Sequence, residues 1–115
     1  MIATSVIERA LAYSGGSHTL ADLEAAIADG RAQLWEGGDS AIVTELKQTP
    51  QQKILLFWLA AGNMTELRGM ARGIEEWGRQ QHCDKAQLIG RRGWERSALV
   101  LDGWKAVSIV MEKEL

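Results

Sequence analysis

The first candidate for chemistry is a turn between an apolar run and an amphipathic segment in the middle of the chain. Gly62 and Asn63 follow that run, and Asn63 with Glu66 has the spacing of a helix-capping box. Such a turn directs free backbone N–H groups and the positive end of a helix at one spot, which makes a generic anion or phosphate site. The alternative is that this turn only connects two elements, because one glycine is far from a glycine-rich fingerprint.

A second candidate is the turn formed by Arg91, Arg92, Gly93 and Trp94. Guanidinium groups beside an indole suit phosphate binding or base stacking, and Arg and Trp dominate binding hot spots. Gly93 lets the backbone turn sharply enough to present both residue types. We therefore predict that this turn is the main interaction surface. The alternative is that Trp94 packs into the core, while the arginines are solvated or pair with Glu95 and Asp102.

The elements that position these two turns follow from the periodicity of the apolar residues. The apolar run from Ile54 to Ala60 predicts a central strand that is buried on both faces. Residues 63–81 predict a long helix packed on the sheet, with a buried stripe made of Leu67, Met70, Ile74 and Trp77. A strand over 85–90 should then lie parallel to the central strand, so the Arg91 turn leaves the carboxyl end of a parallel strand, where open α/β sheets bind ligands.

The remaining segments complete an α/β chain with a mixed sheet. Two N-terminal helices are predicted, one starting near Ser5 and ending at Gly15-Gly16, the other starting at Thr19 and ending at Gly30. Strands over 32–36 and 40–47 form a hairpin, and a turn at Pro50 returns the chain as the third strand of an antiparallel meander. A short helix within 91–101 and a closing strand over 104–114 follow. The predicted closing strand alternates, with Val107, Ile109 and Met111 on one face.

Composition bounds the class of protein. At 115 residues the chain fits one domain, residues 1–115. Its 13 Lys and Arg against 15 Asp and Glu give a net charge of -2, so we expect no general attraction to nucleic acid. The longest apolar run is far too short to span a membrane, and we expect a cytoplasmic protein without a membrane anchor.

Metal and thiol chemistry are not expected. Cys83 is the single cysteine, and the two histidines, His18 and His82, have no further His or Cys at ligand spacing apart from Cys83 next to His82. Neighbours on a chain rarely face one metal together, so we predict no metal site. Cys83 has no identifiable base partner, and we expect a small buried side chain rather than a nucleophile.

The predicted order of elements resembles the GNAT fold of acyl-CoA N-acyltransferases. Within that fold, the chain is similar to small GNAT-like proteins of tailed bacteriophages and prophages, in the stretches Leu34-Trp35, Val43-Thr44-Glu45, Gly90-Arg91-Arg92-Gly93-Trp94 and Gly103-Trp104-Lys105. The resemblance implies a protein of the bacterial host cytoplasm that can also be virion-associated. It further implies a phage or host protein as the partner.

The resemblance also implies what acetyl transfer would require. Catalytic relatives carry Arg/Gln-x-x-Gly-x-Gly/Ala in the loop before the central helix, which would place the cofactor-binding candidates at Gly62, Asn63 and Met64. Leu59 and Met64 replace two of the three marked residues. The strand carboxylate that often acts as general base would be Glu45. The alternative for Glu45 is a solvated strand residue. The family's usual tyrosine acid has no counterpart, because Tyr13 lies in the first helix.

Two functional classes follow from these observations. The missing motif favours an accessory or virion-assembly protein that uses the fold as a binding scaffold, with no cofactor. The alternative is an N-acyltransferase with a degenerate pyrophosphate loop, which would bind acetyl-CoA. Fold alone does not decide between a scaffold and an enzyme.

Overall fold

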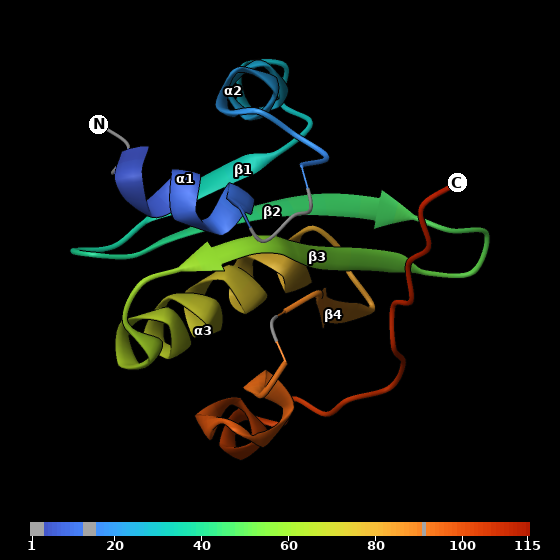
Figure 1. The fold of residues 1–115 in the computed structure, drawn as a ribbon. Coiled ribbons are helices and arrows are strands. Elements are labelled where there is room, and N and C mark those ends of the chain that lie inside the picture. Colours follow the sequence, from blue (N-terminus) through green and yellow to red (C-terminus); the bar gives the residue numbers. More distant parts are fainter. Residues whose placement is uncertain (1–3, 13–15, 91) are drawn as a thin grey trace.

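The computed structural model of the protein describes residues 4–12, 16–90 and 92–115. Figure 1 shows two N-terminal helices, a twisted sheet, a long helix and a C-terminal segment that leaves the body. The elements are α1 (Thr4–Ala12), α2 (Leu20–Ala28), β1 (Gln33–Glu36), β2 (Ala41–Gln48), β3 (Lys53–Ala61), α3 (Met64–Gln80), β4 (Lys85–Leu88) and two short 3-10 helices, η1 (Trp94–Arg96) and η2 (Ala98–Asp102).

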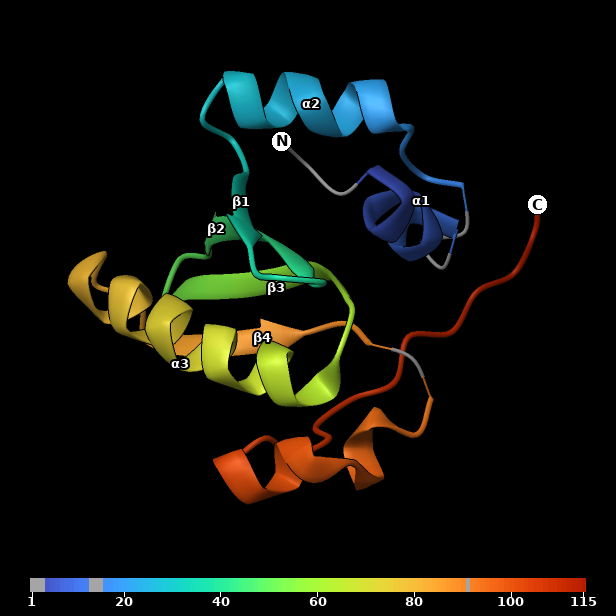
Figure 2. The ribbon, with the colours of Figure 1, turned by 90° about the vertical axis from the view of Figure 1, so that its left-hand side faces the viewer.

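The sheet has the strand order β1-β2-β3-β4. The pairs β1–β2 and β2–β3 are antiparallel, whereas β3 and β4 are parallel and joined through α3. The predicted meander, crossover helix and parallel strand are therefore confirmed. Figure 2 shows α1 and α2 on one face of the sheet and α3 on the other.

Each face of the sheet has its own apolar core. The core under α1 and α2 consists mainly of Ile7, Leu11, Leu23, Val43 and Leu59. The core under α3 consists mainly of Ile42, Leu55, Phe57, Leu67 and Ile74. This arrangement explains the continuous apolar run of β3, because a strand covered on both faces has no solvent side that would require polar residues.

Helix starts follow the predicted capping chemistry. The Thr19 hydroxyl accepts from the backbone N–H of Asp22, and the Asp22 carboxylate accepts from the backbone N–H of Thr19, which forms a full capping box. Asn63 caps α3 through the backbone N–H of Glu66. Gly30 has a φ of +74° just after α2, as expected for a helix stop. The predicted stop after α1 falls partly on Gly15, outside the described residues.

The tryptophans pack mainly against other side chains of the protein. The rings of Trp35 and Trp77 meet edge to face at 5.3 Å, and those of Phe57 and Trp104 at 5.5 Å. Trp35 Nε1 donates to the hydroxyl of the fully buried Thr44, which satisfies that polar group. On α3, Leu67 and Ile74 are buried as predicted, but Met70 and Trp77 are only half-buried.

The C-terminal part of the chain corrects two predictions. The short helix expected within 91–101 is a pair of 3-10 helices, because Ser97 is extended between them and caps η2 through the backbone N–H of Leu99. The closing strand predicted over 104–114 is wrong, since residues 104–115 form no strand. Alternating apolar residues are not sufficient, because a strand also needs a neighbouring backbone to accept and donate its hydrogen bonds.

A bidentate ion pair fastens η2 to α3. Arg68 Nε and Nη2 donate to the two carboxylate oxygens of Asp102 at 2.7 and 2.9 Å, and Arg72 adds a longer contact at 3.5 Å. The hydrogen bonds from Arg68 lower the pKa of Asp102 from 3.8 to about 2. The side chain of Asp102 is only 15% exposed, so this pair holds the C-terminal segment against the long helix.

We expect Asp102→Asn to destabilise the protein at neutral pH and to have little effect near pH 2. The pKa of Asp102 is lower in the folded chain than its ordinary value of 3.8. The pair therefore contributes stability above that value and loses it as the pH falls toward 2. Urea unfolding of both proteins across this range measures the difference. Asp29→Asn is the matched control, since its pair with Arg31 is exposed. A difference that is independent of pH would contradict the prediction.

Candidate functional site

The candidate site is a notch where β3 and β4 separate. Parallel pairing runs from Ile54 opposite Lys85 to Phe57 opposite Leu88, but β3 continues to Ala61. An irregularity in the β2–β3 register marks the same point, since Val43 lies opposite Leu59 and Thr44 opposite Phe57, which leaves Trp58 as the extra residue. Such bulges bend a strand and re-aim its side chains, and they are frequent beside functional sites.

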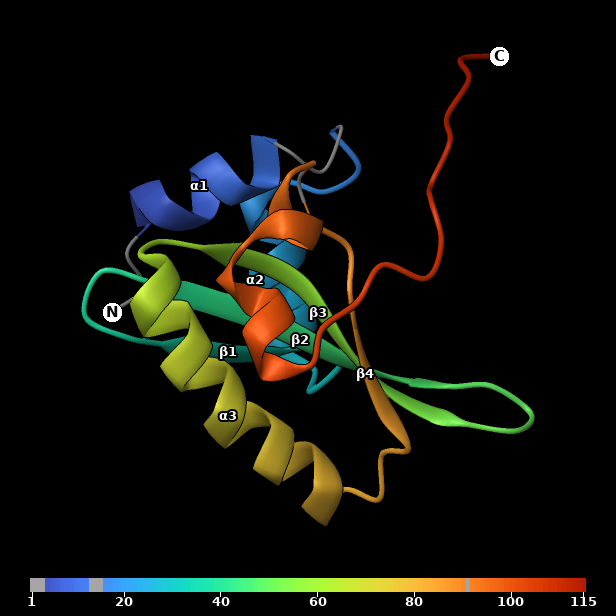
Figure 3. The same ribbon diagram turned by 90° about the horizontal axis from the view of Figure 1, so that it is seen from below.

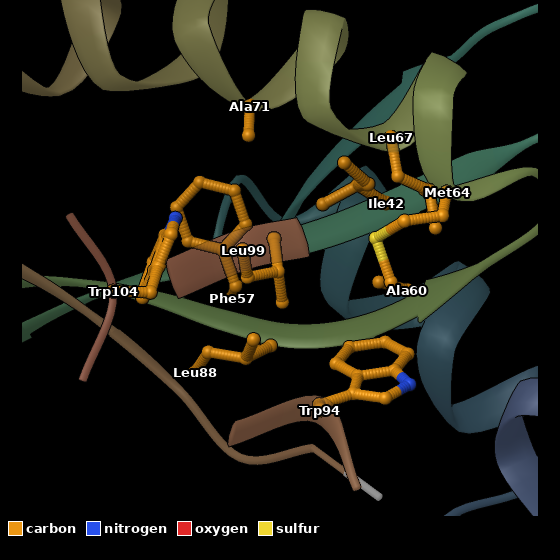
Figure 4. A pocket seen from close by; sticks show the side chains of 10 residues that line it. All are labelled: Ile42, Phe57, Ala60, Met64, Leu67, Ala71, Leu88, Trp94, Leu99 and Trp104. Atoms are coloured by element: carbon orange, nitrogen blue, oxygen red, sulfur yellow. The ribbon is translucent and has the colours of Figure 1, made fainter. Parts of the chain in front are cut away.

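A small apolar cavity lies at the notch. It measures about 20 Å³, which is room for about one water molecule. Figure 4 shows the Met64 and Trp94 side chains reaching toward Ala60 at one side of this cavity. The lining residues are Ile42, Phe57, Ala60, Met64, Leu67, Ala71, Leu88, Trp94, Leu99 and Trp104. The side chains that surround the notch therefore fill most of it.

Trp94 reaches the notch because the chain folds back after β4. Gly93 has a φ of +99°, and the Trp94 ring lies 2.6 Å from the point that a Cβ on Gly90 would occupy. A side chain at position 90 would therefore push the indole away. Trp94 is half-buried, in agreement with the packing alternative for this residue, while Arg92 is exposed.

The exposed Arg92 and Arg96 agree with the solvated form of that alternative, whereas Asp102 has other partners. The Glu95 carboxylate accepts from the backbone N–H of Gly93 at 2.8 Å, and Asp102 pairs with arginines of α3. Hydrogen bonds from the backbone N–H groups of Glu95 and Gly93 lower the pKa of the Glu95 carboxyl. Arg91 lies outside the described residues. The proposed interaction surface at Arg91, Arg92, Gly93 and Trp94 stays a prediction.

The Gly62–Asn63–Met64 turn is held by Ser40. The backbone N–H of Asn63 donates to Ser40 Oγ at 3.0 Å, and Ser40 is buried. Gly62 has a φ of +131°, and a Cβ there would overlap Ser40 Oγ and lie 2.6 Å from Ser40 Cα. The glycine is thus required by close contact with the β1–β2 turn. A contact over such a sequence distance leaves no local signal, which is why Ser40 is not among the residues predicted from sequence.

Glu66 adds negative charge at the start of α3. Its carboxylate accepts from the backbone N–H groups of Gly38 and Asp39 at 2.9 and 3.0 Å. Hydrogen bonds from the Ser40 side chain and from these two N–H groups lower the pKa of Glu66. Glu66 is therefore ionised at neutral pH beside the backbone N–H groups that an anionic ligand would need. The sequence spacing indicates a capping role for Glu66, but its long-range contact with Gly38 and Asp39 leaves no local signal.

Glu45 lies far from the Gly62 turn. It is half-buried in β2 opposite Leu56, which is six positions before Gly62, or about 20 Å along the strand. Thr44 contacts Trp35 in the core under α3, so Glu45 points to the opposite face of the sheet. The structure therefore does not bring Glu45 and the Gly62 turn together.

Cys83 and His18 pack against neighbouring side chains. Cys83 is half-buried against the core under α3, and this burial raises the pKa of its thiol, which disfavours the thiolate. His18 packs edge-on against Trp58 with ring centres 4.4 Å apart. Within the described ranges, no three His, Cys, Asp or Glu side chains are placed to hold a metal ion. None of the helices in that part of the chain is long and apolar enough to cross a membrane.

Solved structures with a similar fold include acetyltransferases. A Trypanosoma brucei acetyltransferase has a TM-score of 0.64 and 14% identity, with 96% of this chain and 92% of that chain covered. The fold is GNAT-like. A tetramutant of the BH1408 protein from Bacillus halodurans has a TM-score of 0.66 and 17% identity, over 97% of this chain and 88% of that chain.

A third similar structure is TTHA1254 from Thermus thermophilus, with a TM-score of 0.61 and 16% identity over 84% of this chain and 79% of that chain. At this level of identity the comparisons establish the GNAT-like fold alone. No protein-family model and no curated protein matches the sequence.

Proposed function

We propose that this protein uses the GNAT-like fold as a binding scaffold and does not transfer acyl groups. Its partner is a protein, in keeping with the Arg91–Trp94 turn and the overall negative charge. The sequence resemblance further suggests a bacteriophage or prophage accessory or virion-assembly protein that acts in the host cytoplasm. The resemblance lies in stretches such as Val43-Thr44-Glu45 and Gly103-Trp104-Lys105.

The occupied notch is the observation that carries the proposal. Acetyl-CoA is the cofactor that the fold implies, and the strand separation beside the α3 N-terminus is the place to test its fit. Met64 and Trp94 line this notch beside Ala60, and its water-sized space of about 20 Å³ is far smaller than the pockets that enclose organic ligands. The residues present therefore do not fit the cofactor.

Electrostatics support the same conclusion. A pyrophosphate is favoured at a helix N-terminus by free N–H groups and the helix dipole. Here hydrogen bonds fix the Glu66 carboxylate at that helix end. The backbone N–H of Asn63 donates to Ser40 Oγ, and the Asn63 side chain accepts from the backbone N–H of Glu66, so neither N–H is free for a ligand. A second anion at this point would be repelled by Glu66.

Exposed apolar and basic residues lie together on the segment after β4. Ile89 is 58% exposed and Leu101 is 79% exposed, and Arg92 and Arg96 are exposed on the same segment. This mixture of arginine and apolar side chains is typical of protein interfaces. It supports a protein partner at the segment that carries the predicted interaction surface.

We expect calorimetry to detect no binding of acetyl-CoA at millimolar ligand, because Met64 and Trp94 occupy the notch and the helix start is acidic. The matched variant is Met64→Gly/Glu66→Gln, which opens the notch and removes the negative charge. Weak binding by this variant alone would show that the two side chains block the site. Micromolar binding by the unmodified protein would instead support the acyltransferase alternative and overturn the proposal.

A further inference from the structure

We propose that residues 105–115 form an arm that adds as a strand to the β4 edge of a second copy of this chain. The arm is the segment in which the sequence predicts a closing strand. The proposal goes beyond the scaffold function, since it concerns self-association rather than recognition of another protein. Figure 3 shows the arm running away from the body that the sheet and helices form.

The arm has the side chains of a buried strand but lies in solvent. Val107 is 72% exposed, Ile109 is 88% exposed and Met111 is 90% exposed. Val110 is exposed as well, so four large apolar residues fall within five positions. Soluble proteins seldom leave such a cluster uncovered unless it belongs to an interface.

The sheet offers an edge that matches the arm. β4 pairs with β3 on one side, and in the described part of the chain no strand lies on its other side. Such an edge presents unpaired N–H and C=O groups that can accept another strand. Ile89, just after β4, is 58% exposed and extends the apolar surface at this edge.

Length and direction favour the edge of a second copy over the arm's own edge. Eleven extended residues reach at most about 36–40 Å, whereas the four residues of β4 span only about 13 Å. Trp104 anchors the arm against Phe57, yet the arm passes the end of β4 without pairing and leaves the body. Its reach is comparable to the 37 Å length of the whole molecule, so it can span a neighbouring copy.

Charge selects an antiparallel orientation. Lys85 is the exposed first residue of β4. An antiparallel arm brings its acidic end, Glu112 and Glu114, toward Lys85, whereas a parallel arm would bring Lys105 there. Two chains that exchange arms in this way form a closed two-fold dimer, in which each chain supplies one arm and one edge.

Sedimentation measurements on the full chain test the arm. We expect a dimer whose dissociation constant rises about a hundredfold or more in Val107→Lys/Ile109→Lys, since these residues would face the partner's core. Ser108→Lys is the matched control, because it adds the same charge at an exposed polar position on the other face of the arm, and it should stay dimeric. A wild-type protein that is monomeric at millimolar concentration, or a double-lysine variant that still dimerises like wild type, would overturn the proposal.

Disulfide trapping distinguishes the two possible edges. Cys83 lies two residues before β4, so a cysteine placed near the end of an antiparallel arm, Glu112→Cys, should oxidise with it. An interchain Cys83 bond, seen as a covalent dimer that Cys83→Ser abolishes, supports the exchange. A bond within one chain would show that the arm closes on its own sheet, and the proposal would then fail. This variant leaves the apolar arm residues intact, so it also covers the case in which the double-lysine variant is unfolded.

Discussion

Gly62→Ala is expected to destabilise the protein by about 3–5 kcal/mol, because it combines backbone strain with an overlap that cannot relax cheaply. Gly62 has a φ of +131°, a backbone angle that residues with a side chain rarely adopt. The new Cβ would also lie 2.6 Å from Ser40 Cα, a backbone atom of the β1–β2 turn. Relief of that overlap would separate the β1–β2 turn from the start of α3 and break the hydrogen bond from Asn63 to Ser40.

Chemical denaturation measures this loss, and the chain contains its own control. Gly69 lies exposed in α3, and a Cβ there would meet nothing within 4 Å. Gly69→Ala should therefore stabilise the protein by about 0.5–1 kcal/mol through helix propensity. If the two substitutions had similar small effects, the turn would not be held as tightly as the structure shows.

Ile74→Ala is expected to destabilise the protein by about 2–5 kcal/mol, since it removes buried methyl groups and leaves a cavity. Ile74 is 2% exposed at the centre of the core between α3 and the sheet. Trp77→Ala should cost less, about 2 kcal/mol, although the indole is much larger. Trp77 is half-buried and packs by its edge on Trp35, so part of its surface is already in water.

The order of these two effects is the informative result. Gln80→Ala, at an exposed position in the last turn of α3, is the control and should change stability by less than about 0.5 kcal/mol. A larger loss for Trp77→Ala than for Ile74→Ala would mean that the indole is the main anchor of the helix.

The sequence by itself determined those parts of the fold for which neighbouring residues carry a clear pattern, namely β3, α3 and the helix caps. The apolar run of β3 and the stripe of Leu67 and Ile74 on α3 have the periodicities of a buried strand and an amphipathic helix, and both elements form. Thr19 and Asn63 cap their helices through neighbours three residues away, so this information is local. The mixed topology follows, because a strand, a helix and a strand in succession give a parallel pair.

Tertiary structure alone decided the state of the candidate site. Ser40 meets Gly62, Glu66 reaches the Gly38 backbone, and Trp94 folds back over Gly90 into the notch. The first two contacts join segments far apart in the chain, and the third depends on a left-handed backbone at Gly93. These contacts cannot be predicted from residue types and their spacing along the chain.

For residues 104–115, the apolar pattern predicted a strand that does not form in the structure. Their alternation of apolar side chains specifies which face a strand would bury, but a strand forms only where a partner edge supplies backbone hydrogen bonds. In this structure no such partner lies beside the segment among the described residues. The sequence by itself determined the elements up to β4 and the helix caps, and the three-dimensional packing decided which apolar groups are covered and which side chains occupy the notch.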